Sequence, residues 1–366
     1  MAVATNKTMS DSQLPAKVVH DSIAVRGKLA LAVGPVASPL DIEYSIYGNL
    51  ACPVIVVLGG ITADRYVLGT KENNTNKATV KDKSSEQLGW WSQLEGANKA
   101  LDTDEHCIVS FNYISRVAIK SSAGNKLEYN LTPSDQAVVL KHLLDVLGIH
   151  KPIKIIGSSY GGMVGLSFAE QFKANIEQLT CISASDRSTH TARAIRSIQK
   201  GIFELADNSI QKHQALSLAR QLSILFYRTD EVFDTQFIDP ATQTPLGKVI
   251  NYDQTIYSYL NHQGQKFANK TSIGNYEALL DSIDAHNVSP KEILCDCSFI
   301  AVPNDRLVSY ESMRRLAQNI KGKSEFYRLE SIYGHDAFLK EFDQLNQLLK
   351  KILGESDESS TSYASC

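Results

Sequence analysis

The stretch IIGSSYGGMVGLSFAEQF, residues 155–172, constrains the fold more than any other part of the sequence. It runs from apolar residues into a glycine and two serines, and it continues as an apolar pattern with helical spacing. Serine is a poor strand former and a glycine run is a poor start for a helix. The sequence therefore departs here from the local preferences of both strand and helix, as sequences often do at functional sites. Flanking glycines allow a sharp strand-to-helix turn that holds the central serine in a strained conformation with its hydroxyl exposed.

Residues Gly157 to Gly161 read G-S-S-Y-G, which is a G-x-S-x-G pattern placed between a predicted strand and a predicted helix. In that context the central serine is a nucleophile. We therefore predict Ser159 as the nucleophile, and Ser158 in the variable second position is the weaker candidate. The backbone N–H of Tyr160 begins the following helix and is predicted to donate to an oxyanion. The alternative is a packing turn whose glycines only allow close contact between helix and strand.

Buried strands alternate with helices along most of the chain. Apolar runs occur at 53–60, 106–112, 152–157, 178–184 and 297–303, and a further strand is expected at 325–332. Consecutive apolar residues fit strands that are buried on both faces of a mostly parallel sheet. Residues 132–149 read as a helix with Thr132 as N-cap, Pro133 at the first position and Asp135 favouring the N-terminal dipole. The last helix is expected at 336–353, so the pattern predicts an α/β fold with a doubly wound sheet.

One region departs from this alternation. From 187 to 287, helical patterns continue without a convincing buried strand. We predict that this segment is a helical cap, inserted over the carboxyl edge of the sheet where ligands bind in such folds. The two parts of the core are then residues 21–186 and 288–354. The polar ends, residues 1–20 and 355–366, are predicted to be disordered.

A nucleophilic serine needs a base and an acid that orients the base, and after this type of turn they follow in the order Ser, Asp, His. Asp305 comes directly after the strand predicted at 297–303, with Glu330 as the fallback. His335 lies on the loop before the last helix, and it alone of the nine histidines has this position. Asp305 as a solvated loop charge is the alternative. The backbone N–H of Ile61, after the strand at 53–60, is predicted as the second oxyanion donor.

Composition excludes several classes of protein. The chain has 366 residues with 43% hydrophobic and 21% charged residues, which is ordinary globular material. A net charge of −3 provides no broad basic field for nucleic acid or an anionic membrane. No apolar run is long enough to span a membrane, and the first residues lack the pattern of a secretory signal, so we expect a cytoplasmic protein. Cys295 and Cys297 have no second pair nearby, and we expect no metal site.

Five segments resemble, in order, the MetX-type homoserine O-acyltransferases of methionine biosynthesis, which belong to the α/β-hydrolase superfamily. They read GWWSQLEGANKALDTDEHCIV, TPSDQAVVLKHLLDVLGI, GSSYGGMVGLSFAEQF, LARQLSILFYRTDEVFDTQF and YGHDAFLKE. The resemblance covers roughly residues 40–353 and supports Ser159 as nucleophile with Asp305 and His335 as its partners. It implies the α/β-hydrolase fold, acyl-CoA as co-substrate without a bound cofactor, and a homodimer formed through the caps. LGGITADR, residues 58–65, is more similar to the branch that uses succinyl-CoA than to the acetyl-CoA branch.

The same resemblance assigns residues to the substrates. Arg220 and Tyr227 match cap residues that line the acceptor site, and Asp336 matches the family's amine-binding aspartate. This agrees with the chemistry, because an amino-acid acceptor carries a carboxylate that suits a guanidinium and an ammonium that suits a carboxylate. Arg65 is a candidate partner for the distal carboxylate of a succinyl group, and a solvated loop arginine is the alternative.

One segment departs from the family pattern. The family usually has a glycine-rich stretch after the strand ending near Asn112, whereas this chain reads NYISRVAIKSSAGNKLEYN, which we expect to be a loop near the site. We predict ping-pong transfer of a succinyl group to homoserine, with acetyl as the other acyl group and serine as the other acceptor. A hydrolase of the same fold that uses water is the main alternative. A non-catalytic binding protein is the second alternative, and the complete set of Ser159, His335 and Asp305 argues against it.

Overall fold

A computed structural model describes residues 18–25, 29–31, 34–36, 40–69, 88–120, 125–237 and 255–354. Most of the two predicted disordered ends, 1–17 and 355–366, lies outside the described residues. For residues 18–20 the prediction of disorder is wrong, because they belong to the first strand. These residues are only partly buried, because β1 lies at the margin of the sheet.

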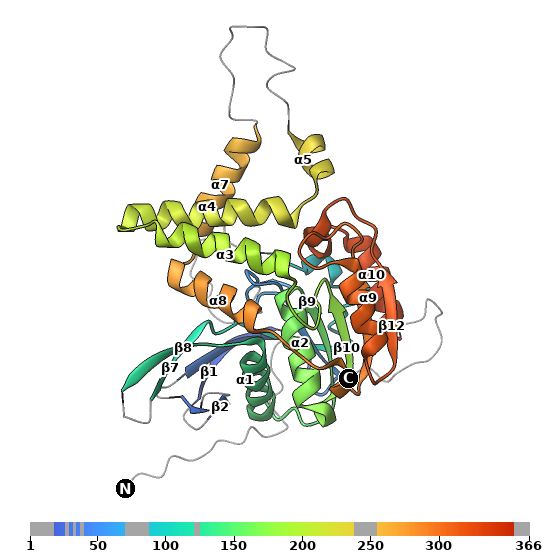
Figure 1. The fold of residues 1–366 in the computed structure, drawn as a ribbon. Coiled ribbons are helices and arrows are strands. Elements are labelled where there is room, and N and C mark those ends of the chain that lie inside the picture. Colours follow the sequence, from blue (N-terminus) through green and yellow to red (C-terminus); the bar gives the residue numbers. More distant parts are fainter. Residues whose placement is uncertain are drawn as a thin grey trace, which may run out of the picture.

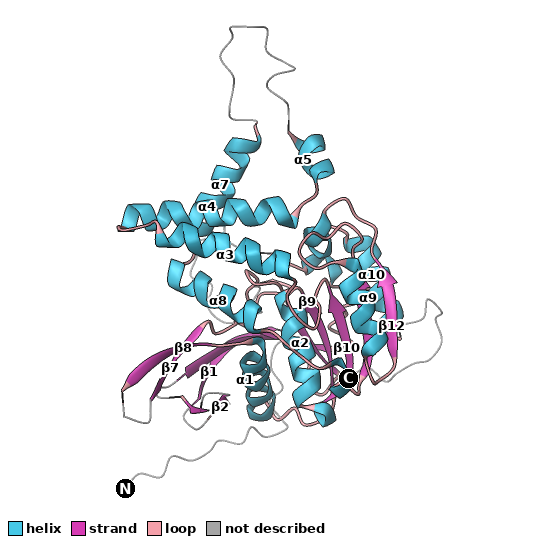
Figure 2. Ribbon diagram, viewed as in Figure 1, coloured by secondary structure: helices cyan, strands magenta, loops and turns pink. Residues whose placement is uncertain are grey.

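An eight-stranded sheet forms the centre of the molecule (Figure 2), in the order β1-β4-β6-β5-β9-β10-β11-β12. These strands are β1 (Val18–Val25), β4 (Leu40–Tyr47), β5 (Val54–Leu58), β6 (Cys107–Phe111), β9 (Ile153–Ser158), β10 (Ile176–Ile182), β11 (Asp296–Ala301) and β12 (Ser324–Arg328). Neighbours from β6 through β12 pair in parallel, whereas β1 with β4 and β4 with β6 pair antiparallel. The predicted mostly parallel sheet is confirmed, and each predicted apolar run overlaps one of its strands.

Helices cover both faces of this sheet. The first hydrophobic cluster joins one face to α1 (Pro133–Val146), α2 (Tyr160–Gln171) and α9 (Tyr310–Asn319). The second cluster joins the opposite face to α10 (Phe342–Leu353) and the 3-10 helix η1 (Ser92–Leu94). Two more short 3-10 helices are η2 (Lys173–Asn175) and η4 (Pro290–Glu292).

Helix α1 begins as predicted, because the Thr132 hydroxyl accepts from Asp135 N and the Asp135 carboxylate accepts from Thr132 N.

The last predicted helix is two elements instead of one. Residues Gly334–Leu339 form the 3-10 helix η5, and α10 starts only at Phe342. The backbone leaves helical geometry between them, at Lys340 and Glu341. The apolar spacing continues across the break because both elements pack on the same cluster, which is why the sequence pattern did not reveal it.

In the described part of the chain, a group of helices lies beyond the edge at which the parallel strands end (Figure 1). They are α3 (His190–Glu204), α4 (Ser209–Tyr227), α5 (Asp230–Gln236), α7 (Ile256–Ala268) and α8 (Ile273–Ala285). Phe203, Leu216 and Tyr276 belong to a separate small core that α3, α4, α7 and α8 share. This is the position that the sequence predicts for the cap, although the exact boundaries at 187 and 287 stay a prediction. In the part of the chain that the structure describes, no helix is long and apolar enough to cross a membrane.

The segment expected as a loop at 112–130 contains a hairpin, so that expectation is corrected. Strands β7 (Arg116–Lys120) and β8 (Lys126–Asn130) pair antiparallel, and a second small pair joins β2 (Ala30–Leu31) to β3 (Gly34–Pro35). The hairpin supports the cap. Asn130 donates to the Asp281 carboxylate at 3.0 Å, and Arg116 donates to the Gly274 carbonyl at 3.2 Å, both on α8.

Candidate active site

The turn between β9 and α2 presents Ser159. Its φ of 52° and ψ of −117° place a non-glycine residue in a strained region of the backbone. The flanking glycines make this turn possible. A Cβ on Gly157 would lie 2.4 Å from the Gly161 carbonyl oxygen, and a Cβ on Gly161 would lie 2.2 Å from that of Leu58. The glycines therefore serve close backbone approach, and their effect is to hold the Ser159 hydroxyl above the sheet edge.

Three side chains from distant parts of the chain form a hydrogen-bonded relay. The Ser159 Oγ lies 2.8 Å from His335 Nε2, and His335 Nδ1 lies 2.7 Å from Asp305 Oδ2. The other Asp305 oxygen accepts from the backbone N–H groups of Leu307 and Val308 at 2.8 and 2.9 Å. Both Asp305 and His335 are buried. The carboxylate is therefore fixed in position, and it holds the imidazole with Nε2 directed at the serine.

The environment of His335 suits a base. Burial alone lowers the pKa of His335, but the charge and hydrogen bond of Asp305, with a further contribution from Asp336, outweigh it and raise the pKa above its ordinary value. The imidazolium that forms when His335 takes a proton is thus stabilised. Glu330, the fallback for Asp305, is exposed and pairs with Arg328 instead.

The two predicted oxyanion donors lie beside the nucleophile. Tyr160 is the first residue of α2, so its N–H is among the free donors at the start of that helix. The segment after β5 passes close to the serine, because a Cβ on Gly60 would lie 3.7 Å from the Ser159 Cβ. Ile61 follows in that segment and lines the same pocket as Ser159. The structure brings these residues together, and their role as donors stays a prediction.

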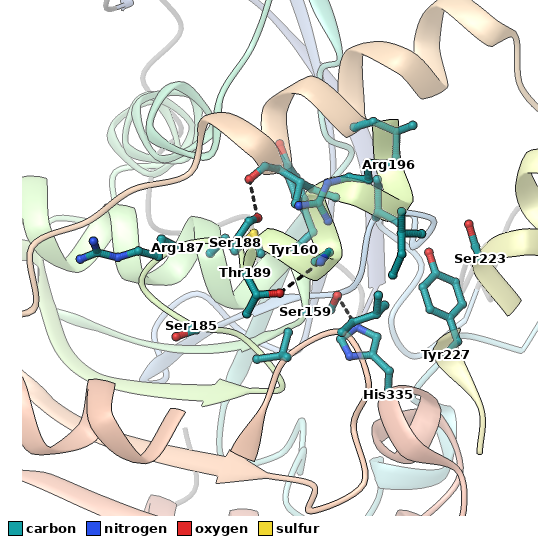
Figure 3. A pocket seen from close by; sticks show the side chains of 18 of the residues that line it. Ser159, Tyr160, Ser185, Arg187, Ser188, Thr189, Arg196, Ser223, Tyr227 and His335 are labelled. Atoms are coloured by element: carbon teal, nitrogen blue, oxygen red, sulfur yellow. Dashed lines mark hydrogen bonds between the residues drawn. The ribbon is translucent and has the colours of Figure 1, made fainter. Parts of the chain in front are cut away.

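A pocket lies between the Ser159–His335 pair and the cap (Figure 3). Its cap wall includes Tyr227 of α4, Tyr276 of α8 and one face of α3. Its charged lining residues, other than His335, are the arginines Arg187 and Arg196, and no aspartate or glutamate is among the described residues that line it. The pocket is therefore a mixed apolar and cationic space, closed on one side by the relay.

Comparison with known proteins defines the family. The model of the alpha/beta hydrolase fold matches residues 53–342. The homoserine O-succinyltransferase of Xanthomonas campestris pv. campestris is 30% identical, over 98% of this chain and 92% of that protein. The chain belongs to the homoserine O-acyltransferase family. The predicted family is thereby confirmed.

Other relatives extend this result. The homoserine O-acetyltransferase of Moorella thermoacetica is 26% identical over 89% of this chain and 94% of that protein. A solved homoserine O-acetyltransferase from Staphylococcus aureus has a TM-score of 0.74 at 21% identity, covering 94% of this chain and 97% of that one. Esterase E22 has a TM-score of 0.74 at 17% identity, covering 92% and 100%. At these identities the solved structures show that the fold is shared.

Two of the predicted acceptor residues lie together in the cap. Tyr227 lines the pocket, and its ring centroid lies 5.8 Å from that of His335. The Arg220 guanidinium lies over the Tyr227 ring at 5.2 Å and over the Phe267 ring at 5.1 Å. Arg220 is behind Tyr227 and is not among the described pocket-lining residues. Its Nη1 is buried and has no hydrogen-bond partner among the described residues, so its N–H groups can still donate to a carboxylate ligand.

The remaining two predicted residues already have protein partners. Asp336 accepts from Arg228 Nε at 3.2 Å, and it is not among the described pocket-lining residues. Arg65 lies 2.8 Å from a Glu43 carboxylate oxygen and donates to the Tyr66 hydroxyl at 3.0 Å. The structure does not place Arg65 in the pocket lining, because these contacts hold its guanidinium beside β4.

Sequence reasoning did not identify the pocket residues of α3. Ala192, Ile195, Arg196 and Gln199 follow helical spacing and share one face, and all four line the pocket. The spacing was visible in the sequence. However, it could not indicate whether this face contacts another helix or a substrate pocket.

Cys295 and Cys297 are buried, with their sulfur atoms 3.9 Å apart at the start of β11. Among the described residues, no cluster of three or more His, Cys, Asp or Glu side chains could hold a metal ion.

Proposed function

We propose that this chain is an acyl-CoA-dependent O-acyltransferase that transfers a succinyl or acetyl group to the hydroxyl of L-homoserine, as a step of methionine biosynthesis. The observation that carries the proposal is the Ser159–His335–Asp305 relay beneath a helical cap, in a chain 30% identical over nearly its whole length to a homoserine O-succinyltransferase. We further infer a cytoplasmic homodimer that needs no bound cofactor or metal, with small molecules instead of nucleic acid or membrane as partners.

In the first half-reaction, His335 Nε2 takes the Ser159 hydroxyl proton while Oγ attacks the thioester carbonyl carbon. Asp305 keeps the ring oriented and stabilises its positive charge. The carbon–sulfur bond then breaks, His335 returns the proton to the sulfur, and CoA leaves as a thiol. The product is an ester between Ser159 and the acyl group.

The tetrahedral intermediates carry a negative oxygen that must be stabilised. We assign this role to the backbone N–H groups of Tyr160 and Ile61. One such donor contributes about 3–4 kcal/mol in comparable sites. Because backbone groups are fixed by the fold, they cost little reorganisation during the reaction.

In the second half-reaction, homoserine enters with its hydroxyl toward the acyl-enzyme. We assign its carboxylate to Arg220, whose Nη1 has no partner among the described residues and whose guanidinium contacts Tyr227, the residue beside His335. The ammonium goes to Asp336, which shares its charge with Arg228. His335 deprotonates the homoserine hydroxyl, whose oxygen attacks the carbonyl carbon of the Ser159 ester. The bond to Ser159 Oγ then breaks, His335 returns the proton to Oγ, and the acyl group leaves on homoserine. The cap limits access of water, which otherwise competes as acceptor.

The direct test is a thiol assay of CoA release from succinyl-CoA and acetyl-CoA, each with homoserine, with serine or with water alone. Rapid continuous release only with homoserine is the expected result. Faster release with serine would make serine the acceptor. Equal release in water alone would identify a thioesterase and would remove the proposed roles of Arg220 and Asp336.

A further inference from the structure

We propose that Arg196 binds the distal carboxylate of a dicarboxylic acyl group, so that the donor is of the succinyl-CoA class. This inference rests on the proposed function and specifies its substrate. It also replaces Arg65, which the sequence suggested for this contact, by a residue of the pocket wall.

The first argument is the position of Arg196. It lies on the pocket-facing side of α3 with Ala192, Ile195 and Gln199, while Ser159 enters the same pocket from the sheet (Figure 3). An acyl group bound to Ser159 must extend into this space. Its chain would pass apolar side chains, and a polar end would meet the guanidinium.

The second argument is that Arg196 is buried but only partly satisfied. It is 8% exposed. Its Nε donates to Asp284 Oδ1 at 2.8 Å, and Nη2 lies 2.7 Å from the same oxygen. Nη2 nevertheless has no partner with hydrogen-bond geometry among the described residues. A guanidinium has five N–H donors in a rigid fork, and one carboxylate oxygen cannot satisfy them all. Asp284 therefore positions Arg196 and leaves donors for a second carboxylate.

The third argument is the charge of the pocket. No acidic side chain is among its described lining residues, and its cations are Arg187 and Arg196 apart from the relay histidine. The Arg187 side chain is 61% exposed and pairs with Asp186, so solvent screens it. Arg196 is the buried cation. An acetyl group ends in a methyl group, which would leave the N–H groups of Arg196 unpaired. A polar site rejects an analogue that lacks the matching polar group in this way.

The contrast with Arg65 supports the same assignment. Arg65 lies beside β4, where it contacts both Glu43 and the Tyr66 hydroxyl, and the structure does not place it in the pocket lining. An acyl group on Ser159 would have to leave the pocket to reach it, whereas Arg196 is inside.

The experiment measures the first half-reaction alone. The full-length enzyme is mixed with succinyl-CoA or acetyl-CoA without an acceptor, and the burst of CoA release gives the acylation rate. We expect Arg196→Gln to lower kcat/KM for acylation by succinyl-CoA by about 100-fold or more, as for loss of a buried charge pair. Acylation by acetyl-CoA should change less than about threefold, because that donor does not use the contact. Arg196→Lys should recover part of the succinyl rate, since it keeps the charge without the fork.

Lys200→Gln is the matched control. Lys200 lies one turn further along α3, pairs with Asp281 and lies 3.7 Å from Asp284, but it does not line the pocket. The Lys200→Gln variant should keep the preference of the unmodified enzyme between succinyl-CoA and acetyl-CoA. If Arg196→Gln unfolds because Asp284 loses its closest cationic partner, the double variant Arg196→Gln/Asp284→Asn removes both charges and keeps the test possible.

Three results would overturn the inference: an equal loss with both donors in a folded variant, no loss with either donor, or, when full turnover is measured as well, an effect confined to the KM for homoserine. The last would assign Arg196 to the acceptor. Failure of the proposed function has a different signature, because then the unmodified enzyme would release CoA from neither donor, or would release it equally with and without homoserine.

Discussion

At the scale of single residues, the activity depends on how Asp305 and the charge of Asp336 act on His335. Asp305 supplies a hydrogen bond of 2.7 Å and a full negative charge, and Asp336 adds a second charge. Their combined effect exceeds that of burial and raises the pKa of His335. Because the base must be neutral to accept the serine proton, the acid limb of activity should lie above the ordinary histidine pKa of about 6.5.

Asp305→Asn tests this electrostatic arrangement. The acylation rate should fall by about 10⁴-fold, because the ring loses its orientation and the stabilisation of its charged form. The acid limb of kcat/KM for acyl-CoA should also move to lower pH, since the main influence that raises the pKa of His335 is removed. The pH–rate profile of both proteins gives this shift. An acid limb at an unchanged pH would show that Asp305 does not control the titration of His335.

Arg220→Met tests the proposed acceptor contact. We expect kcat/KM for homoserine to fall by about 100-fold, as for the loss of a buried charge-assisted contact, while acylation by the donor stays within about threefold of the unmodified enzyme. Arg220→Lys is the control and should recover part of the activity. Separate measurement of the two half-reactions distinguishes the outcomes. A loss in acylation as large as that in transfer would contradict the assignment.

At the scale of elements, the β9–α2 turn depends on glycine for backbone contact. Gly161→Ala would place a methyl group 2.2 Å from the Leu58 carbonyl oxygen, so α2 must shift away from β5. We expect a loss of about 1–3 kcal/mol in the free energy of unfolding, as for other overpacked sites, together with a large loss of activity. Chemical denaturation monitored by circular dichroism measures the change.

Gly201→Ala provides the matched control for that variant. A Cβ at Gly201 meets nothing within 4 Å, and the residue lies inside α3. Alanine should therefore stabilise the helix by about 0.5–1 kcal/mol. If both variants unfold like the unmodified protein, the glycine pattern has no role in packing.

The elements that sequence predicted well are those whose signal is local. Helix α1 has its cap at Thr132, and the buried parallel strands are continuous apolar runs. The hairpin at 116–130 was missed because its β8 strand is exposed or half-buried, so KLEYN carries no run of buried residues. The break at Lys340 was missed because it preserves the apolar face on both sides.

The site shows the same division. Ser159, Asp305 and His335 could be placed because each follows a recognisable strand end in a fixed chain order. Arg196 could not be placed in the site from the sequence, because its position in the pocket depends on how α3 lies over the sheet, which is a tertiary property. Arg65 shows the converse: the sequence suggested a ligand for it, whereas in the folded chain it contacts Glu43 and is not among the described pocket-lining residues.

At the scale of the whole molecule, the cap leaves and rejoins the core at adjacent points. The Asp186 carbonyl accepts from Val288 N at 3.0 Å, and His286 Nε2 lies 3.0 Å from the Ser185 carbonyl oxygen. His286 is 2% exposed. Burial lowers the pKa of His286 to about 4, against smaller opposing effects of the Ser185 carbonyl and Asp186. This junction positions the cap over the relay and should be sensitive to acid.

The direction of the acid sensitivity follows from the coupling between folding and protonation of His286. An unfolded histidine takes up a proton near pH 6.5, whereas folded His286 resists protonation down to about pH 4, so stability falls as the pH is lowered through that window. For His286 the expected loss in the free energy of unfolding is about 2 kcal/mol between about pH 7 and pH 5. His286→Gln should flatten the pH dependence of the unfolding free energy by that amount. Parallel curves for the two proteins would contradict a neutral, buried His286 at the junction.

The central claim is that Ser159 carries the acyl group between CoA and homoserine. Its most direct test is the intact mass of the protein after exposure to succinyl-CoA without acceptor, followed by peptide mapping. The account predicts an added mass of one succinyl group on the peptide that contains Ser159, its absence in Ser159→Ala, and its discharge on addition of homoserine to give the succinyl ester. A protein that stays unmodified while CoA release from acyl-CoA and homoserine proceeds at full rate would contradict the account.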